Sequence, residues 1–315
     1  MPESLDPDKI ESKLAGLDPN ARSRFWTLYS ASENRLKATE LAERRALLRA
    51  LKDATADLEG SVAAEFARAG EGGWNIARLR RLGRYDAFLR QIEDRIRALG
   101  GTIESSVERA MLRNFKQAYA ETGFRLAQMT PESVGLSFDM LPDHAILALS
   151  HEPFSGADFS ERIGLITDEM AHRIKKELTT SMIQGDSWSA VARRIRDFMG
   201  TRGRGAMWRA DMIARTEITR AQELGAAQLY KENEDVIEKV VWLAHPGACP
   251  ICAGLNGTEV DPDDEDTLPP EASHPNCRCT TQAVPTEFDV AGVRPRQSFN
   301  DFAAEALPQV LDIPV

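Results

Sequence analysis

The chain has 315 residues and a formal net charge of −10, with a hydrophobic content of 42% and a charged content of 28%, as in globular proteins. Its longest apolar runs, such as residues 240–244, are far too short to span a bilayer. Residues 1–12 are acidic and polar, so we expect no secretory signal. The composition therefore predicts a protein with no membrane partner that works in the cytoplasm or in a particle assembled there.

Apolar side chains recur every three or four residues through most of the first 235 positions, which predicts a long helical body. One such row runs from Leu48 to Phe66. A second runs from Leu82 to Leu99, and Gly100-Gly101 is expected to end that helix. A third row follows from Ile103 to Tyr119, and we take residues 1–130 as an N-terminal helical region.

A looser stretch, residues 131–156, contains several Pro and Gly and is predicted to be a linker. Residues 157–235 form a second helical block, in which glycines at 185 and 200 are expected to end successive helices. The next helix, from about 207 to 231, carries small residues on its inner face that would let another backbone approach closely: Ala210, Ala214, Ala221 and Gly225.

The pattern changes after Asp235. Residues 236–242 are rich in Val and predict a strand, and Pro, Gly and Asp become frequent from 246 to 275. The predicted fold class is therefore mainly α, with a long helical body, a small α+β zinc-binding module with short strands at 236–285, and an extended C-terminal tail at 286–315. A loop-rich module of this size buries too little apolar area to fold without a metal or disulfides.

The C-terminal part is acidic, because residues 236–315 hold 13 Asp and Glu against 4 Lys and Arg. The rest of the chain is nearly balanced in charge. Phosphate binding needs clustered basic side chains, so this imbalance argues against nucleic acid as the partner of the module. The simpler interpretation is that the acidic side chains keep this part of the chain solvated.

All four cysteines lie within residues 249–279. The segment reads Cys249-Pro-Ile-Cys252, then 21 residues, then His274-Pro-Asn-Cys277-Arg-Cys279. A Cys-x-x-Cys turn followed by a second pair from a distant part of the chain is the pattern of a tetrahedral zinc site. The alternative is a set of reduced or redox-active cysteines without metal, although a thioredoxin-like pair would need a βαβ setting that the sequence lacks.

Five side chains compete for four zinc positions. Cys249 and Cys252 are the firmest ligands. Adding Cys277 and Cys279 would give a four-cysteine site, whereas His274 with one of those two would give a site of three cysteines and one histidine. The spacing leaves both sets open.

A structural zinc is favoured over a catalytic one. Zinc deaminases place a His-x-Glu motif ahead of Pro-Cys-x-x-Cys. Here His245 is followed by Pro246 and Gly247, with no Glu two residues on. His245 could pack beside the site, but we expect it to be a surface residue of the turn.

These motifs together resemble a known family. The helix Ala214-Arg-Thr-Glu-Ile-Thr-Arg-Ala221, Trp242, the run from Cys249 to Gly257 and the run from His274 to Cys279 occur in that order. They are similar to the phage head morphogenesis domain of phage Mu F-like minor head proteins. The resemblance covers about residues 157–285.

The resemblance implies a non-enzymatic minor capsid protein of a phage, prophage or gene transfer agent, acting in head assembly and DNA packaging or delivery. It implies a location in the capsid interior or at the portal vertex, after assembly in the host cytoplasm. The implied partners are the portal protein, the major capsid or scaffold protein, and packaged DNA. Candidate DNA contacts are Arg202, Arg204 and Arg209, with ordinary ion-paired arginines as the alternative. A zinc-dependent nucleic-acid-binding or effector enzyme module is the competing function.

Overall fold

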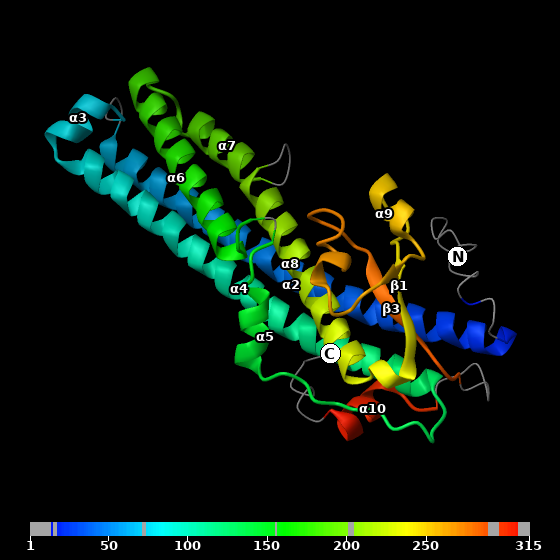
Figure 1. Ribbon diagram of the computed structural model, residues 1–315. Coiled ribbons are helices and arrows are strands. Elements are labelled where there is room, and N and C mark those ends of the chain that lie inside the picture. Colours follow the sequence, from blue (N-terminus) through cyan, green and yellow to red (C-terminus); the bar gives the residue numbers. More distant parts are fainter. Residues whose placement is uncertain are drawn as a thin grey trace. The chain divides into compact units, whose positions relative to one another are not determined.

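The computed structural model describes residues 14, 18–70, 74–154, 156–200, 205–288 and 296–307. These residues are mainly helical and carry a small three-stranded sheet, which confirms the prediction of a mainly α protein with short strands (Figure 1). Within this part of the chain, none of the helices combines the length and the apolar character that a bilayer crossing requires.

The chain divides into two compact units that alternate along the sequence. The first unit takes described residues from 1–42, 108–155 and 215–315. The second takes described residues from 43–107 and 156–214. The segment boundaries predicted from the sequence follow changes of composition and stay predictions.

Among the described residues of unit two, all of the secondary-structure elements are helices. It contains the C-terminal part of α2 (Pro19–Ala69), α3 (Ile76–Arg81), the first part of α4 (Arg84–Met129), α6 (Phe159–Gln184), α7 (Trp188–Met199) and the start of α8 (Ala206–Glu232). A capping box at Asp158 and Glu161 starts α6, and Gly185 ends it in the left-handed conformation at φ 70°. The predicted ends at Gly185 and Gly200 are confirmed.

The expectation that Gly100-Gly101 ends a helix is wrong, because α4 runs through both glycines to Met129. A Cβ at position 100 would lie 2.9 Å from Cγ2 of Thr167 on α6. The glycine therefore allows two helices to approach closely instead of ending one of them. Buried Leu99 and Ile103 on either side keep the apolar face of α4 continuous.

Unit one combines helices with the sheet. Beside the remaining parts of α2, α4 and α8 it contains α5 (Asp143–Ser150), η2 (Glu234–Val236), β1 (Ile237–Leu243), α9 (Pro250–Leu255), β2 (Glu259–Val260), η3 (Glu265–Thr267), β3 (Thr280–Pro285) and α10 (Phe299–Ala306). The strand order is β2-β1-β3, and both pairs are antiparallel. Trp242 on β1 lies opposite Thr281 on β3 and is fully buried.

Two elements differ from the sequence prediction. The predicted linker contains α5, and the predicted extended tail contains α10. The side chain of Ser298 caps α10 by accepting a hydrogen bond from the backbone N–H of Asp301, and Phe299 and Phe302 pack against Phe124 of α4. Two aromatic contacts give this short helix apolar burial that the tail's weak pattern does not reveal.

The close approach predicted for the helix with small residues is confirmed at Gly225. A Cβ at this position of α8 would lie 2.3 Å from the carbonyl oxygen of Phe115 on α4. Such a distance is far inside van der Waals contact, so only glycine allows the two backbones to pass at this point.

Glu223 is a buried carboxyl between α8 and β3. Its Oε2 accepts hydrogen bonds from the backbone N–H and the hydroxyl of Thr281, at 3.0 and 2.7 Å. Burial raises the pKa of Glu223 to about 8, above the ordinary value of 4.5. The carboxyl is therefore protonated in the folded protein at neutral pH, whereas it is ionised in the unfolded chain.

We expect the stability contributed by protonated Glu223 to be complete below pH 4.5 and to be lost as pH rises towards 8. The folded state holds more protons than the unfolded state in this window, so stability falls with pH, by up to about 1.4 kcal/mol per pH unit for one group. Glu223→Gln keeps an acceptor for Thr281 and removes the titration. Urea unfolding from pH 5 to 8 should show a smaller fall in stability for the variant than for the wild type; equal slopes would contradict this.

Candidate metal centre

The first cysteine pair lies where β1 leads through a turn into α9. Cys249 is the N-cap of α9, and Pro250 occupies its first turn, where a missing N–H costs nothing. The carbonyl of Cys249 accepts a hydrogen bond from the N–H of Ala253 at 2.8 Å, which closes the turn. Cys252 is buried within this turn.

The turn after α9 returns to β1 and fixes the first pair against the sheet. The N–H of Gly257 donates to the carbonyl of Trp242, and the N–H of Trp242 donates to the carbonyl of Thr258, both at 2.8 Å. The side-chain oxygen of Asn256 accepts from the N–H of Ala244 at 2.9 Å. The Asn-Gly that follows the cysteine pair therefore has a structural role.

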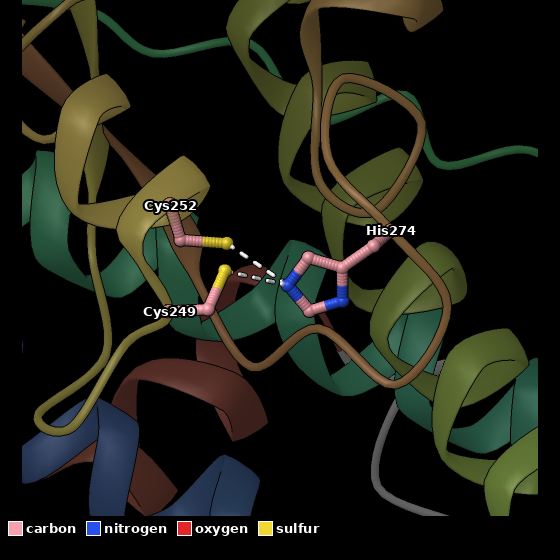
Figure 2. Close-up of side chains that lie close together, drawn as sticks. All are labelled: Cys249, Cys252 and His274. Atoms are coloured by element: carbon pink, nitrogen blue, oxygen red, sulfur yellow. Dashed lines mark hydrogen bonds between the residues drawn. The ribbon is translucent and has the colours of Figure 1, made fainter.

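The second group of candidate ligands lies on the segment that enters β3. His274, Cys277 and Cys279 come from this segment, and Asn276 between them has a left-handed backbone at φ 66°. The Nδ1 of His274 pairs with the carbonyl of Pro275 at 2.8 Å. This contact leaves Nε2 directed at the first cysteine pair (Figure 2).

Three candidate ligands meet at the His274 ring. The Nε2 atom lies 3.2 Å from Sγ of Cys249 and 3.3 Å from Sγ of Cys252 (Figure 2). A tetrahedral zinc ion with Zn–S of about 2.3 Å and Zn–N of about 2.0 Å separates sulfur and nitrogen ligands by about 3.5 Å. The donor atoms are therefore close to the spacing that a shared metal requires.

A second triad contains Cys252, Cys277 and Cys279, whose sulfur atoms lie within 4.8 Å of one another. The sulfurs of Cys252 and Cys277 are 3.8 Å apart. A disulfide would hold them at about 2.05 Å, whereas two thiolates on one zinc lie about 3.8 Å apart. Cys252 belongs to both triads. The structure thus brings together all five predicted candidates, and both ligand sets allowed by the sequence remain available.

The protonation of the thiols is uneven. The side-chain hydrogen bond with Cys279 lowers the pKa of Cys277 to about 5. Burial raises the pKa of Cys252 to about 12. The backbone hydrogen bond from Cys252 lowers the pKa of Cys249. Neighbouring thiols this close cannot all ionise without a cation, and a divalent metal supplies that charge.

The candidate ligands share a small apolar core with the sheet. Three of the cysteines are at most 3% exposed and pack against Trp242 and Ala244: Cys252, Cys277 and Cys279. A shell of this kind excludes water from the sulfur atoms of these three cysteines.

The expectation that His245 is a surface residue of the turn is wrong. It is half-buried, and its backbone N–H donates to Sγ of Cys279 at 3.4 Å. Burial lowers the pKa of its imidazole. The turn after β1 therefore contacts Cys279 of the second cysteine pair.

The sequence analysis also missed the residues of α8 that contact the centre. Arg215 and Thr216 bond to Asn276, and the hydroxyl of Thr219 donates to the carbonyl of Cys277 at 3.1 Å. The only sequence signal for these contacts was the Arg-Thr-Glu helix within the family resemblance.

Of the three candidate DNA contacts, the structure describes one. Arg202 and Arg204 lie outside the described residues. Arg209 forms an ion pair with Glu169 on α6, and this pairing lowers the pKa of the Glu169 carboxyl. Contact of these three arginines with DNA stays a prediction.

The fold and the cluster define a class: a mainly helical protein with a small antiparallel sheet that presents a Cys/His group able to hold a metal. Residues 172–282 match the family described as Phage Mu protein F like protein. This match confirms the resemblance seen in the sequence, and it spans α8, β1, β2, the start of β3 and all five candidate ligands.

A curated protein of Enterococcus faecalis (strain ATCC 700802 / V583), NAD(+)--arginine ADP-ribosyltransferase EFV, is 26% identical over 197 residues. The alignment covers 58% of this chain and 39% of that protein, so this chain matches well under half of the relative's length. No solved structure matches the chain significantly.

Proposed function

We propose that this protein is a minor head protein of a phage, prophage or gene transfer agent, which acts in head assembly and in DNA packaging or delivery near the portal. The observation that carries the proposal is the family match over residues 172–282, since it coincides with the metal-centre module and the helix that contacts it. The portal protein and the major capsid or scaffold protein are the proposed partners.

We further propose that the centre binds one zinc ion with a structural role. Three of the five candidate ligands are buried cysteines, and the donor atoms form two triads, joined at Cys252, in which each set of three lies within 4.8 Å. A catalytic zinc needs an open position for water and substrate, and the burial of these three thiols favours a structural role instead. The donor set also favours zinc over magnesium or calcium, which prefer oxygen ligands.

An effector enzyme is the alternative raised by the name of the Enterococcus faecalis relative. The aligned region is 39% of that protein, so the activity in its name extends to this chain only if the aligned region carries it. The burial of the cysteines supports a structural module instead. When the purified chain is incubated with labelled NAD and an arginine-containing acceptor, we expect no label on the acceptor. Labelling of the acceptor would support the alternative.

Quantitative mass spectrometry of purified DNA-containing particles tests the head-protein proposal. We expect the chain to be present at a small fraction of the copy number of the major capsid protein, because the proposed role is that of a minor component. Its absence from particles and from their assembly precursors would contradict the proposal. A tail or host protein of similar abundance in the same lysate provides the control for contamination.

A further inference from the structure

The segment that carries the second group of ligands is held by helix α8. The hydroxyl oxygen of Thr216 accepts a hydrogen bond from the backbone N–H of Asn276 at 2.8 Å. Nη1 of Arg215 donates to the side-chain oxygen of Asn276, also at 2.8 Å. One helical turn on, the Thr219 hydroxyl donates to the carbonyl of Cys277 at 3.1 Å. Two consecutive residues of the segment are thus bound to one face of one helix.

Asn276 is where the segment turns. Its φ of 66° makes it the one non-glycine residue with positive φ in the part of the chain that the structure describes. A left-handed backbone is unfavourable for an L-residue, and Asn is one of the few that adopts it because its short polar side chain can form hydrogen bonds. The turn brings His274 within 3.3 Å and Cys277 within 3.8 Å of the same sulfur atom, that of Cys252.

The helix face that holds Asn276 is itself fixed. Thr216 is 1% exposed, and Arg215 also pairs with Glu40 of α2, with 3.3 Å between Nε and Oε1. Both side chains of that ion pair are at most 19% exposed. Helix α8 therefore offers a donor and an acceptor whose positions do not depend on a metal.

We propose that Thr216 and Arg215 are positioning residues of the metal centre, which hold Asn276 in its left-handed turn and so set His274 and Cys277 at ligand distance from Cys252. The inference rests on the proposed zinc site. Groups that orient ligands typically change metal affinity by about 10- to 100-fold when removed. Arg215 and Thr216 thereby influence how tightly the centre binds its metal.

Thr216→Val in the full-length chain tests the proposal, because valine keeps the shape of threonine and removes the oxygen. Metal-free protein is titrated with Co²⁺, whose visible spectrum reports ligand geometry, and with Zn²⁺ against a chromophoric chelator. We expect Zn²⁺ affinity to fall about 10- to 100-fold and the Co²⁺ spectrum to change. Thr216→Ser, which keeps the hydroxyl, should restore both.

Thr130→Val is the matched control. Thr130 is equally buried, at 2% exposed, and its hydroxyl donates to the carbonyl of Leu126 within α4. Its loss should lower stability in urea but leave Zn²⁺ affinity and the Co²⁺ spectrum unchanged. Equal weakening by Thr130→Val would show a general loss of stability and overturn the inference.

A second variant is placed at Asn276, outside α8, so that its effect does not depend on a substitution in that helix. Asn276→Ala removes the contact with Arg215 and places an alanine in the left-handed region, so it should also weaken Zn²⁺ binding at least tenfold. Wild-type Zn²⁺ affinity in both Thr216→Val and Asn276→Ala would overturn this inference and leave the proposed zinc site intact. A wild-type chain that binds no Zn²⁺ or Co²⁺ would overturn the proposed zinc site, and the inference with it.

Discussion

Cys252→Ser is expected to abolish zinc binding and to leave residues 236–285 open to proteolysis. Cys252 is the one residue that belongs to both candidate triads, so its loss disrupts the four-cysteine set and the set with His274 alike. Structural zinc sites bind with apparent free energies of about 10–16 kcal/mol in small peptides, and that binding is coupled to folding. Removal of the shared ligand should therefore affect the module more than any other single substitution of a ligand.

The measurement is zinc per chain by elemental analysis, together with the pattern of limited proteolysis. Chelation of wild-type protein should produce the same pattern, which links the effect to the metal. Ile251→Ser is the matched control, because Ile251 is the neighbouring residue and is 58% exposed. One zinc per chain at wild-type affinity in Cys252→Ser would contradict the prediction.

The remaining ligands can be assigned by the same measurement. His274→Ala should bind zinc poorly if His274 completes the site, and nearly as well as the wild type if Cys277 and Cys279 complete it together. Where His274→Ala binds poorly, Cys277→Ser and Cys279→Ser identify the fourth ligand, because only the variant that lacks this ligand loses zinc. These variants decide between the sets that both the sequence and the geometry leave open.

Gly225→Ala is expected to destabilise unit one by about 3 kcal/mol. The added Cβ would meet the carbonyl oxygen, carbonyl carbon and Cα of Phe115 at 2.3, 3.0 and 3.2 Å. These are backbone atoms in the middle of α4, so relief requires one helix to move instead of a side chain to rotate. Overpacking of a core typically costs about 1–3 kcal/mol, and a clash between backbones lies at the upper end.

Urea unfolding followed by circular dichroism measures this change. Gly164→Ala provides a control, since Gly164 lies within α6 and a Cβ there would meet nothing within 4 Å. Alanine should stabilise that helix by up to about 1 kcal/mol through its higher helix propensity. If Gly225→Ala were as stable as Gly164→Ala, the close approach of α8 and α4 would be refuted.

The long helices and the first strand could be predicted from the sequence because their signals are local, whereas the short helices α5 and α10 were missed. Apolar periodicity predicted α6, α7 and α8, and Gly185 and Gly200 marked the ends of two of them. Gly100 was misinterpreted because a glycine can serve either a helix end or a close contact, and its neighbour Thr167 is distant in sequence. Composition alone could not separate these two roles.

In the candidate site, too, some features could be predicted from local sequence and others could not. The spacing of Cys249, Cys252, His274, Cys277 and Cys279 predicted their convergence, because few arrangements other than a metal site use that pattern. The placement of His245 and the contacts from Arg215 and Thr216 could not be predicted from spacing. They depend on how a turn and a helix pack over the segment, which is set by tertiary structure.

Unit one is built from three separate stretches of the sequence, and this has a consequence for synthesis on the ribosome. Glu40 pairs with Arg215, and Gln128 accepts a hydrogen bond from the backbone N–H of Arg296, so contacts of this unit join residues about 170 positions apart. At about 5–20 residues per second, the N-terminal part of α2 waits roughly 10–40 s for its partners to emerge. Buried side chains such as Phe25 and Leu28 stay exposed during that interval. Completion of this unit therefore waits for α8 and the sheet, and the nascent chain is most prone to aggregation before they emerge.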